Sequence, residues 1–329
     1  MQITSILDII DGRLLNHPSI SYIYSLKMIA SKVREGDLFI ARDLDDISLA
    51  VQNGAFAIIV DRIYPIIDKE IAWIRVDNID RCLVQLLRYK LAHFNLEAYY
   101  CEKVSYDLLN IFSNSSSRAI KVIPNSLDYF IKYINDIEDG DILICNDKKL
   151  LDKLYPNNKE FIVNKYKIEN LIEHSLFEVS FSYKNNYFPK LKISTIYINN
   201  FLSVYEFLES TLEYSRLKYF NHLKPIFLDR NMNLTDFGKS DKFIISQNTK
   251  NLLKDEISFL KEKFSYAKTI FLTSKYINEL DNQQILIEDI KDIKKELKKH
   301  SFNAAYIVGF EFDELSKNLI KLEKELTLF

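Results

Sequence analysis

One junction of the sequence, EAYYCEKVSYDLLNIF over residues 97–112, carries side chains that could contact a phosphate. The pattern predicts the end of a strand, a short turn and an amphipathic helix, which is where many nucleotide-binding proteins place a glycine-rich phosphate loop. Lys103 would supply a cation and Ser105 a hydroxyl, so both are candidate nucleotide-binding residues. The turn itself, however, contains Cys101 and Glu102 and no glycine.

Glycine is scarce in the whole chain, with six among 329 residues, and the closest two, Gly36 and Gly54, are 18 positions apart. This spacing excludes the GxxxxGK[ST] and GxGxxG motifs, which need glycine so that several N–H groups can converge on a phosphate. The one GKS triplet, residues 238–240, lacks an upstream glycine and is interpreted as a turn. Residues 97–112 are therefore either the position of a phosphate loop that no longer works or an ordinary strand-to-helix turn.

Other side chains that could do chemistry show no supporting pattern. The three cysteines form no CxxC pair, which indicates neither a zinc site nor a disulfide framework. The histidines show no HxH, HxxxH or HExxH spacing, so structural roles are favoured over metal ligation. These histidines are His17, His93, His174, His222 and His300. The sequence thus predicts no metal site and no catalytic residue.

The composition bounds the class of protein. The chain is 47% hydrophobic and 27% charged with a formal net charge of −2, which is ordinary for a soluble globular protein and gives no electrostatic reason to expect nucleic acid. No apolar stretch approaches the roughly 18 residues of a membrane span, and the N-terminus lacks the pattern of a signal peptide. We therefore expect no membrane span, no nucleic-acid partner and a cytoplasmic location.

The pattern of expected strands and helices, which must position these side chains, predicts an α/β fold. It divides into three segments, residues 1–94, 95–218 and 219–329. The first combines apolar strands with helices, one of which begins after a candidate cap, Asn78. The second alternates strand and helix, as in a parallel sheet, and then shows a hairpin around residues 184–186. The third returns to α/β alternation of the Rossmann-like kind.

The first segment resembles the N-terminal domain of the Mur ligase family, nearest to its MurF members. Three stretches carry the resemblance in order and spacing: KVREGDLFIA (32–41), NGAFAIIVD (53–61) and WIRVDNIDRCLVQLLRYKL (73–91). The resemblance implies a three-domain architecture with a small N-terminal α/β domain, a central parallel-sheet ATPase-like domain with a hairpin, and a C-terminal Rossmann-like domain. It also implies ATP and Mg²⁺ as cofactors of a ligase that adds D-alanyl-D-alanine to a UDP-linked peptide.

When this sequence is compared with the phosphate-loop motif of that family, Lys103 falls near the position of the phosphate-binding lysine. Ser105 falls near the position of the hydroxyl residue of the loop. Ser31 and Lys32 stand at and beside the family's uridine-contacting Asp-Ser-Arg, of which this chain keeps little. The phosphate-loop glycines are absent, and no equivalent of the carbamoylated lysine or the magnesium carboxylate is evident. A triphosphate needs a ring of N–H donors and a metal held by oxygen ligands, which a single lysine does not replace.

Three functions follow from these departures. The first is a non-catalytic, Mur-ligase-like protein of bacterial cell-wall metabolism, without a cofactor, that binds a precursor or a partner enzyme of envelope synthesis. The second is a divergent ATP- and Mg²⁺-dependent amide ligase acting on a UDP-sugar peptide. The third is a structural or interaction module with no small-molecule site.

Overall fold

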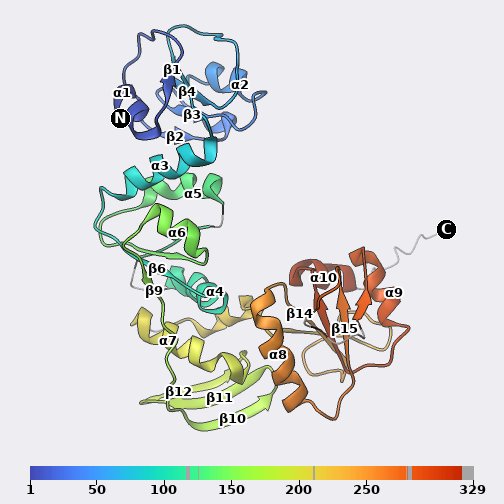
Figure 1. Ribbon diagram of the computed structural model, residues 1–329. Coiled ribbons are helices and arrows are strands. Elements are labelled where there is room, and N and C mark those ends of the chain that lie inside the picture. The colour runs from blue at the N-terminus through green and yellow to red at the C-terminus, as the bar shows by residue number, and fades with distance from the viewer. Residues whose placement is uncertain (116–118, 125, 210–211, 279, 281–283, 321–329) are drawn as a thin grey trace, which may run out of the picture. The chain divides into compact units, whose positions relative to one another are not determined.

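The structure is a computed structural model, and it describes residues 1–115, 119–124, 126–209, 212–278, 280 and 284–320. The chain forms two compact units, which we treat separately (Figure 1). Unit 1 comprises Met1–Glu102 and Ser116–Ile162, and unit 2 comprises Lys103–Ser115 and Val163–Phe329. The mixed α/β class is confirmed, whereas the division at residues 94 and 218 stays a prediction.

Unit 1 begins with a five-stranded sheet in the order β1-β5-β4-β3-β2, in which only β1 pairs antiparallel. Its strands β3 and β4 are wholly buried, as their continuous apolar runs predict for parallel strands. The elements are α1 (Ile3–Ile10), β1 (Arg13–Leu14), β2 (Leu26–Lys27), the 3₁₀ turn η1 (Ala30–Lys32), β3 (Leu38–Ile40), α2 (Ile47–Gln52), β4 (Ala57–Val60) and β5 (Ala72–Arg75). Gly54 ends the α2 region at φ +92°, a conformation that suits glycine.

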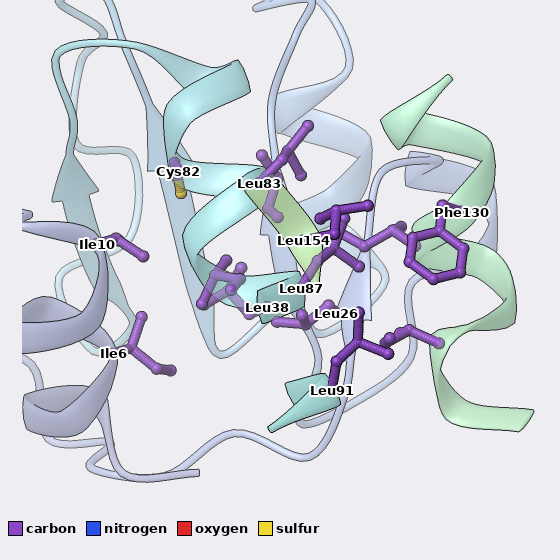
Figure 2. Close-up of a cluster of buried hydrophobic side chains, with 14 of the residues drawn as sticks. Ile6, Ile10, Leu26, Leu38, Cys82, Leu83, Leu87, Leu91, Phe130 and Leu154 are labelled. Carbon is purple, nitrogen blue, oxygen red and sulfur yellow. The ribbon is translucent and has the colours of Figure 1, made fainter. Parts of the chain in front are cut away.

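The rest of unit 1 is a four-stranded parallel sheet in the order β7-β8-β6-β9, with helices packed on it. The elements are α3 (Ile79–Leu91), β6 (Glu97–Tyr100), β7 (Ile120–Val122), α5 (Leu127–Tyr133), β8 (Ile142–Cys145), α6 (Lys148–Leu154) and β9 (Lys159–Glu160). The predicted cap is confirmed, because the Asn78 side chain accepts from the Arg81 N–H. Figure 2 shows α3 side chains such as Leu83 and Leu87 joining residues from both sheets' helices and strands in one core.

Unit 2 contains α4 (Lys103–Phe112), which packs on α7 (Ile198–Leu208), and an antiparallel sheet in the order β10-β11-β12. The strands are β10 (Glu169–Ser175), β11 (Glu178–Tyr183) and β12 (Asn186–Leu191). The predicted hairpin is confirmed, with Lys184 at φ +52° in its turn. Strand β10 was not predicted, because its residues are mostly exposed and show no apolar alternation.

The second sheet of unit 2 has the order β13-β14-β17-β15-β16, and only β13 pairs antiparallel. Its strands are β13 (Pro225–Phe227), β14 (Phe243–Ser246), β15 (Thr269–Thr273), β16 (Gln284–Leu286) and β17 (Ala304–Val308), and its helices are α8 (Lys250–Lys263), α9 (Ile293–Leu297) and α10 (Phe312–Leu319). Strands β14 and β17 are buried along their length. Parallel pairing with intervening helices agrees with the predicted Rossmann-like pattern. Within the described part of the chain, no helix has the length and apolarity that crossing a bilayer requires.

Candidate functional site

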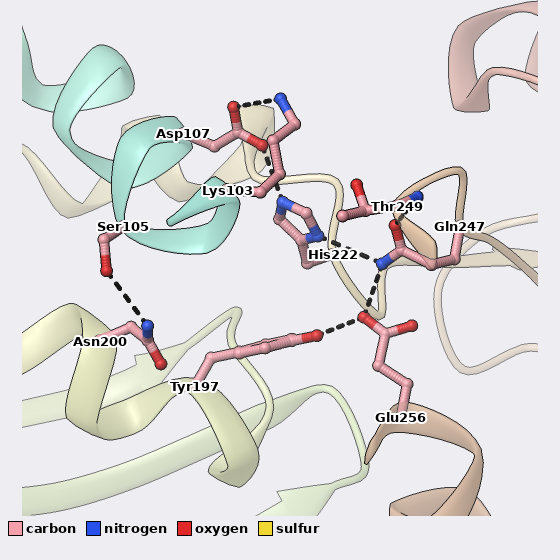
Figure 3. A network of polar contacts seen from close by, with 9 residues as sticks. All are labelled: Lys103, Ser105, Asp107, Tyr197, Asn200, His222, Gln247, Thr249 and Glu256. Carbon is pink, nitrogen blue, oxygen red and sulfur yellow. Dashed lines mark hydrogen bonds and ion pairs between the residues drawn. The ribbon is translucent and has the colours of Figure 1, made fainter. Parts of the chain in front are cut away.

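A chain of polar contacts in unit 2 links residues that lie far apart in the sequence (Figure 3). It runs from Lys103 through Asp107 and His222 to Gln247 and Glu256. These residues come from α4, from the segment before β13, from the end of β14 and from α8. Buried polar groups are normally fully hydrogen bonded, and such networks fix the orientation of every member.

Helix α4 places the first two members on one face. Lys103 and Asp107 are four residues apart, and the Lys103 Nζ lies 2.7 Å from the Asp107 carboxylate. The other carboxylate oxygen of Asp107 lies 2.7 Å from the His222 Nε2. Burial would raise the pKa of Asp107, but the hydrogen bonds from His222 and Lys103 outweigh burial and lower that pKa below its ordinary value. Asp107 therefore compensates the charge of Lys103 within the protein.

The orientation of Gln247 fixes the tautomer of His222. The Thr249 N–H donates to the Gln247 Oε1 at 2.9 Å, so the Gln247 Nε2 is the group that faces Glu256 and His222. This Nε2 is a donor, and the His222 Nδ1, 3.3 Å away, must accept from it. The proton of a neutral ring then sits on Nε2 and is donated to Asp107 (Figure 3). Both ring nitrogens of His222 are thus engaged by the protein.

Glu256 closes the network inside the unit and has no exposed surface. Its carboxylate accepts from the hydroxyls of Tyr197 and Tyr306 and, at 2.8 Å, from the Gln247 Nε2. Burial raises the pKa of Glu256, and the hydrogen bonds from the two tyrosines and from Gln247 oppose that rise. Burial likewise raises the pKa of each tyrosine. Three donors on one carboxylate make the interaction structural, because no oxygen of Glu256 is presented to solvent.

A pocket of about 300 Å³ adjoins this network in unit 2. Its lining is mostly polar and includes the following residues of the network and its surroundings: Lys103, Asp107, His222, Gln247, Asn248 and Glu311. Its size falls at the lower end of the range of small-molecule sites. Two carboxylates and one lysine line it, so the pocket does not concentrate positive charge as a polyphosphate site does.

The candidate nucleotide-binding residues lie differently in the structure. Lys103 lines the pocket, whereas the Ser105 side chain is fully buried and accepts from the Asn200 Nδ2 at 3.2 Å (Figure 3). In the turn before α4, the Cys101 N–H donates to the carbonyl of Cys145 at 2.8 Å and so extends the sheet of unit 1. The structure therefore keeps Lys103 near solvent and turns Ser105 into the helix packing.

The candidate substrate-binding residues Ser31 and Lys32 both belong to η1 and are both exposed. Lys32 lines a second pocket, of about 140 Å³, in unit 1, together with Lys27 and Lys132. None of these three lysines pairs with a carboxylate among the residues that the structure describes. Ser31 does not line this pocket.

The lysine pocket of unit 1, defined by Lys27, Lys32 and Lys132, has a fourth cation beside it. The Lys90 Nζ donates to Asn135, a lining residue, at 2.8 Å. Burial lowers the pKa of Lys90, and the charge of Lys27 lowers it further. Four lysines this close together without an acidic partner among the described residues create a positive potential that an anion would relieve.

Sequence reasoning missed the polar network, since it assigned His222 a structural role without a partner. One signal was present: Glu256 interrupts the apolar stripe of α8, whose other buried residues are Leu253, Ile257 and Leu260. A carboxylate at such a position needs buried donors. Over the described ranges, no group of three or more His, Cys, Asp or Glu side chains is placed to hold a metal ion.

Comparison with solved structures identifies the fold. The MurF ligase of Thermotoga maritima, solved in complex with ADP, is similar over 90% of this chain and 96% of its own, with a TM-score of 0.53 and 15% identity. A second similar structure is the UDP-N-acetylmuramoylalanyl-D-glutamyl-2,6-diaminopimelate–D-alanyl-D-alanyl ligase of Acinetobacter baumannii. Its TM-score is 0.53 and its sequence identity is 10%, over 96% of this chain and 97% of its own. A further structure of MurF from that organism has a TM-score of 0.50 and 12% identity, over 97% of this chain and 88% of its own.

The chain is Mur-ligase-like in fold. At 10–15% identity these likenesses concern the fold and not the chemistry. No protein-family model matches the chain, and no curated protein matches its sequence. The function must therefore be argued from the side chains.

Proposed function

We propose that this protein is a Mur-ligase-like pseudoenzyme of bacterial cell-wall metabolism, which binds a UDP-linked peptide precursor and does not form an amide bond. The ligand would lie in the lysine pocket of unit 1. The observation that carries the proposal is that the Cys101 N–H, the Lys103 ammonium and the Ser105 hydroxyl, three groups of the candidate phosphate loop, are each engaged by the protein. Loss of catalysis with retention of binding would explain why the fold persists.

The backbone and side chains of that stretch do not fit a triphosphate. A cradle needs several free N–H groups pointing inward, but the Cys101 N–H belongs to a sheet. The Lys103 cation is compensated by Asp107, and Ser105 is buried against Asn200. Binding a triphosphate here would require breaking these contacts and placing four negative charges beside Asp107 and Glu102. We derive no step through ATP or Mg²⁺.

The lysine pocket supplies the binding side of the proposal. A pocket of about 140 Å³ accommodates a phosphate or diphosphate group but not a whole UDP-linked peptide, which would extend over the surface. Lys27, Lys32 and Lys132 present ammonium groups that no described carboxylate neutralises. Hydrogen bonds between charged partners contribute about 1.5–3 kcal/mol each, so three such contacts supply roughly 4.5–9 kcal/mol. Because association itself costs several kcal/mol, contacts of the remaining ligand with the surface must supply the rest of the affinity.

Isothermal titration calorimetry on the full chain tests the proposal. UDP-N-acetylmuramoyl-tripeptide should bind, and the double variant Lys32→Ala/Lys132→Ala should weaken binding by about tenfold or more, because tenfold corresponds to about 1.4 kcal/mol. Lys69→Ala, an exposed lysine elsewhere in unit 1, is the matched control and should leave affinity unchanged. ATP with Mg²⁺ should give no binding at millimolar concentration.

Two other outcomes separate the alternatives. Micromolar, Mg²⁺-dependent ATP binding that is lost in Lys103→Ala would refute the proposal and support a divergent ligase, a reading that the position of Lys103 on a pocket wall would then explain. If neither UDP-N-acetylmuramoyl-tripeptide nor ATP binds, the proposal is refuted and the structural or interaction module is the function that remains.

A further inference from the structure

A third pocket, in unit 2, is lined mainly by aromatic and aliphatic side chains. Its volume is about 140 Å³. The walls are formed by Phe177, Ile193, Leu217, Phe220, Leu223 and Phe237. Most of these side chains are buried, whereas Phe237 is 44% exposed and lies toward solvent. We call this cavity the aromatic pocket.

The size of the aromatic pocket sets the size of its ligand. An apolar cavity of about 150 Å³ in a protein interior holds one benzene molecule. The aromatic pocket is therefore large enough for a single six-membered ring and too small for a nucleobase with its sugar. Rings such as those of Phe177 and Phe220 favour edge-to-face contact with an aromatic guest.

A buried hydroxyl without a partner lies in the wall of this pocket. Ser194 is 1% exposed, and its Oγ has no hydrogen-bond partner within the described residues. Leaving a buried polar group unsatisfied costs free energy, and ligand atoms often supply the missing partner. The Oγ itself has less than 1 Å² of exposed surface, so the hydroxyl can donate to a ligand oxygen once the Ser194 side chain rotates toward the pocket.

The charged groups on the pocket are all cationic. Lys192, Lys218 and Lys224 line it, and none of the described lining residues is a carboxylate. The Lys192 Nζ lies 5.2 Å from the centre of the Phe237 ring. Burial lowers the pKa of Lys224; the charge of Asp313 opposes that effect, and the charge of Lys192 adds to it. A ligand that carries a negative charge at the rim would be favoured over a neutral or cationic one.

We propose that the aromatic pocket binds a small aromatic carboxylate, with its ring among the phenylalanines and its carboxylate at the Ser194 hydroxyl and Lys192. This site is independent of the lysine pocket of unit 1. His222 also lines the aromatic pocket, so the ring of the ligand would lie beside a residue that is held by Asp107 and Gln247.

Ligand-observed NMR on the full chain tests this proposal with benzoate as the probe. Benzoate has nine non-hydrogen atoms, and a ligand of this size with a high binding free energy per atom reaches a Kd of about 1 mM or tighter. Benzyl alcohol and benzylamine share the ring but not the negative charge, and acetate shares the charge but not the ring. We expect benzoate to bind at least about tenfold more tightly than each of the three.

Two substitutions locate the site. Lys192→Met should weaken benzoate binding about tenfold, whereas Lys254→Met, at an exposed lysine of α8 outside the pocket, should not change it. Ser194→Ala removes a hydroxyl without a partner, so the protein should fold normally and bind benzoate several-fold more weakly. Equal binding of benzoate and benzyl alcohol, no binding of benzoate, or equal effects of the two lysine substitutions would overturn the proposal.

Discussion

Replacing Asp107 by asparagine should destabilise unit 2 in a way that depends on pH. Asp107 accepts from both Lys103 and His222 at 2.7 Å, and its side chain is 25% exposed. Hydrogen bonds to charged groups contribute about 1.5–3 kcal/mol each. Asparagine keeps one acceptor oxygen and presents an amide NH₂ to the other donor, so one of the two contacts is lost. We expect a loss of roughly 2 kcal/mol in the free energy of unfolding at pH 7.

The pH dependence of this loss follows from the direction of the pKa shift. The pKa of Asp107 is lower in the folded protein than its ordinary value of 3.8. The contribution of the carboxylate is therefore fully present above that ordinary value and is lost as the pH falls through the folded pKa. The difference between wild type and Asp107→Asn should therefore shrink as the pH falls below about 4.

Amide hydrogen exchange in urea, followed in α4 and α8, measures this difference in unit 2. Fluorescence would not serve, because the only tryptophan, Trp73, belongs to unit 1. Asp236→Asn is the matched control within unit 2: Asp236 forms an exposed i,i+3 pair with Lys239 and should contribute little. A loss in Asp107→Asn no larger than in the control, or one that grows as the pH falls, would show that the network does not stabilise the unit as argued.

Three further substitutions test other parts of the structure. Because burial raises the pKa of Glu256, its stabilising contribution is present below its ordinary pKa of 4.5 and is lost as the pH rises through the folded pKa. The urea midpoint of wild type should therefore fall relative to that of Glu256→Gln as the pH rises above 4.5. Gly309→Ala should destabilise unit 2 more than Gly238→Ala in thermal unfolding: both glycines have positive φ, but a Cβ at 309 would lie 1.9 Å from the Ser274 Oγ, whereas a Cβ at 238 would have no neighbour within 4 Å. Leu83→Ala should cost about 2–5 kcal/mol in urea unfolding followed by tryptophan fluorescence, because Leu83 is fully buried in the core of unit 1.

The elements were predictable where the sequence acts locally. Continuous apolar runs predicted buried parallel strands such as β4 and β8, and Asn78 predicted the start of α3. The run EFIVN (160–164) predicts a strand, but β9 contains only residues 159–160. The run FDELSKNLIKLEKEL (312–326) predicts a helix, which is described to Leu319; residues 321–329 lie outside the described part. Edge strands and helix ends depend on neighbours that a local pattern does not contain.

The sequence by itself determined what the chain lacks: glycines 18 or more positions apart cannot form a phosphate cradle of the usual kind, whatever the fold. It also contained the i,i+4 spacing of Lys103 and Asp107, which any helix brings together. Only the tertiary structure placed His222, 115 residues from Asp107, against that carboxylate. Hydrogen bonds between distant segments follow from how sheets and helices pack, and a short window of sequence does not encode that packing. For the same reason only the fold could show that Ser105 is buried and that the Ser194 hydroxyl has no partner among the described residues.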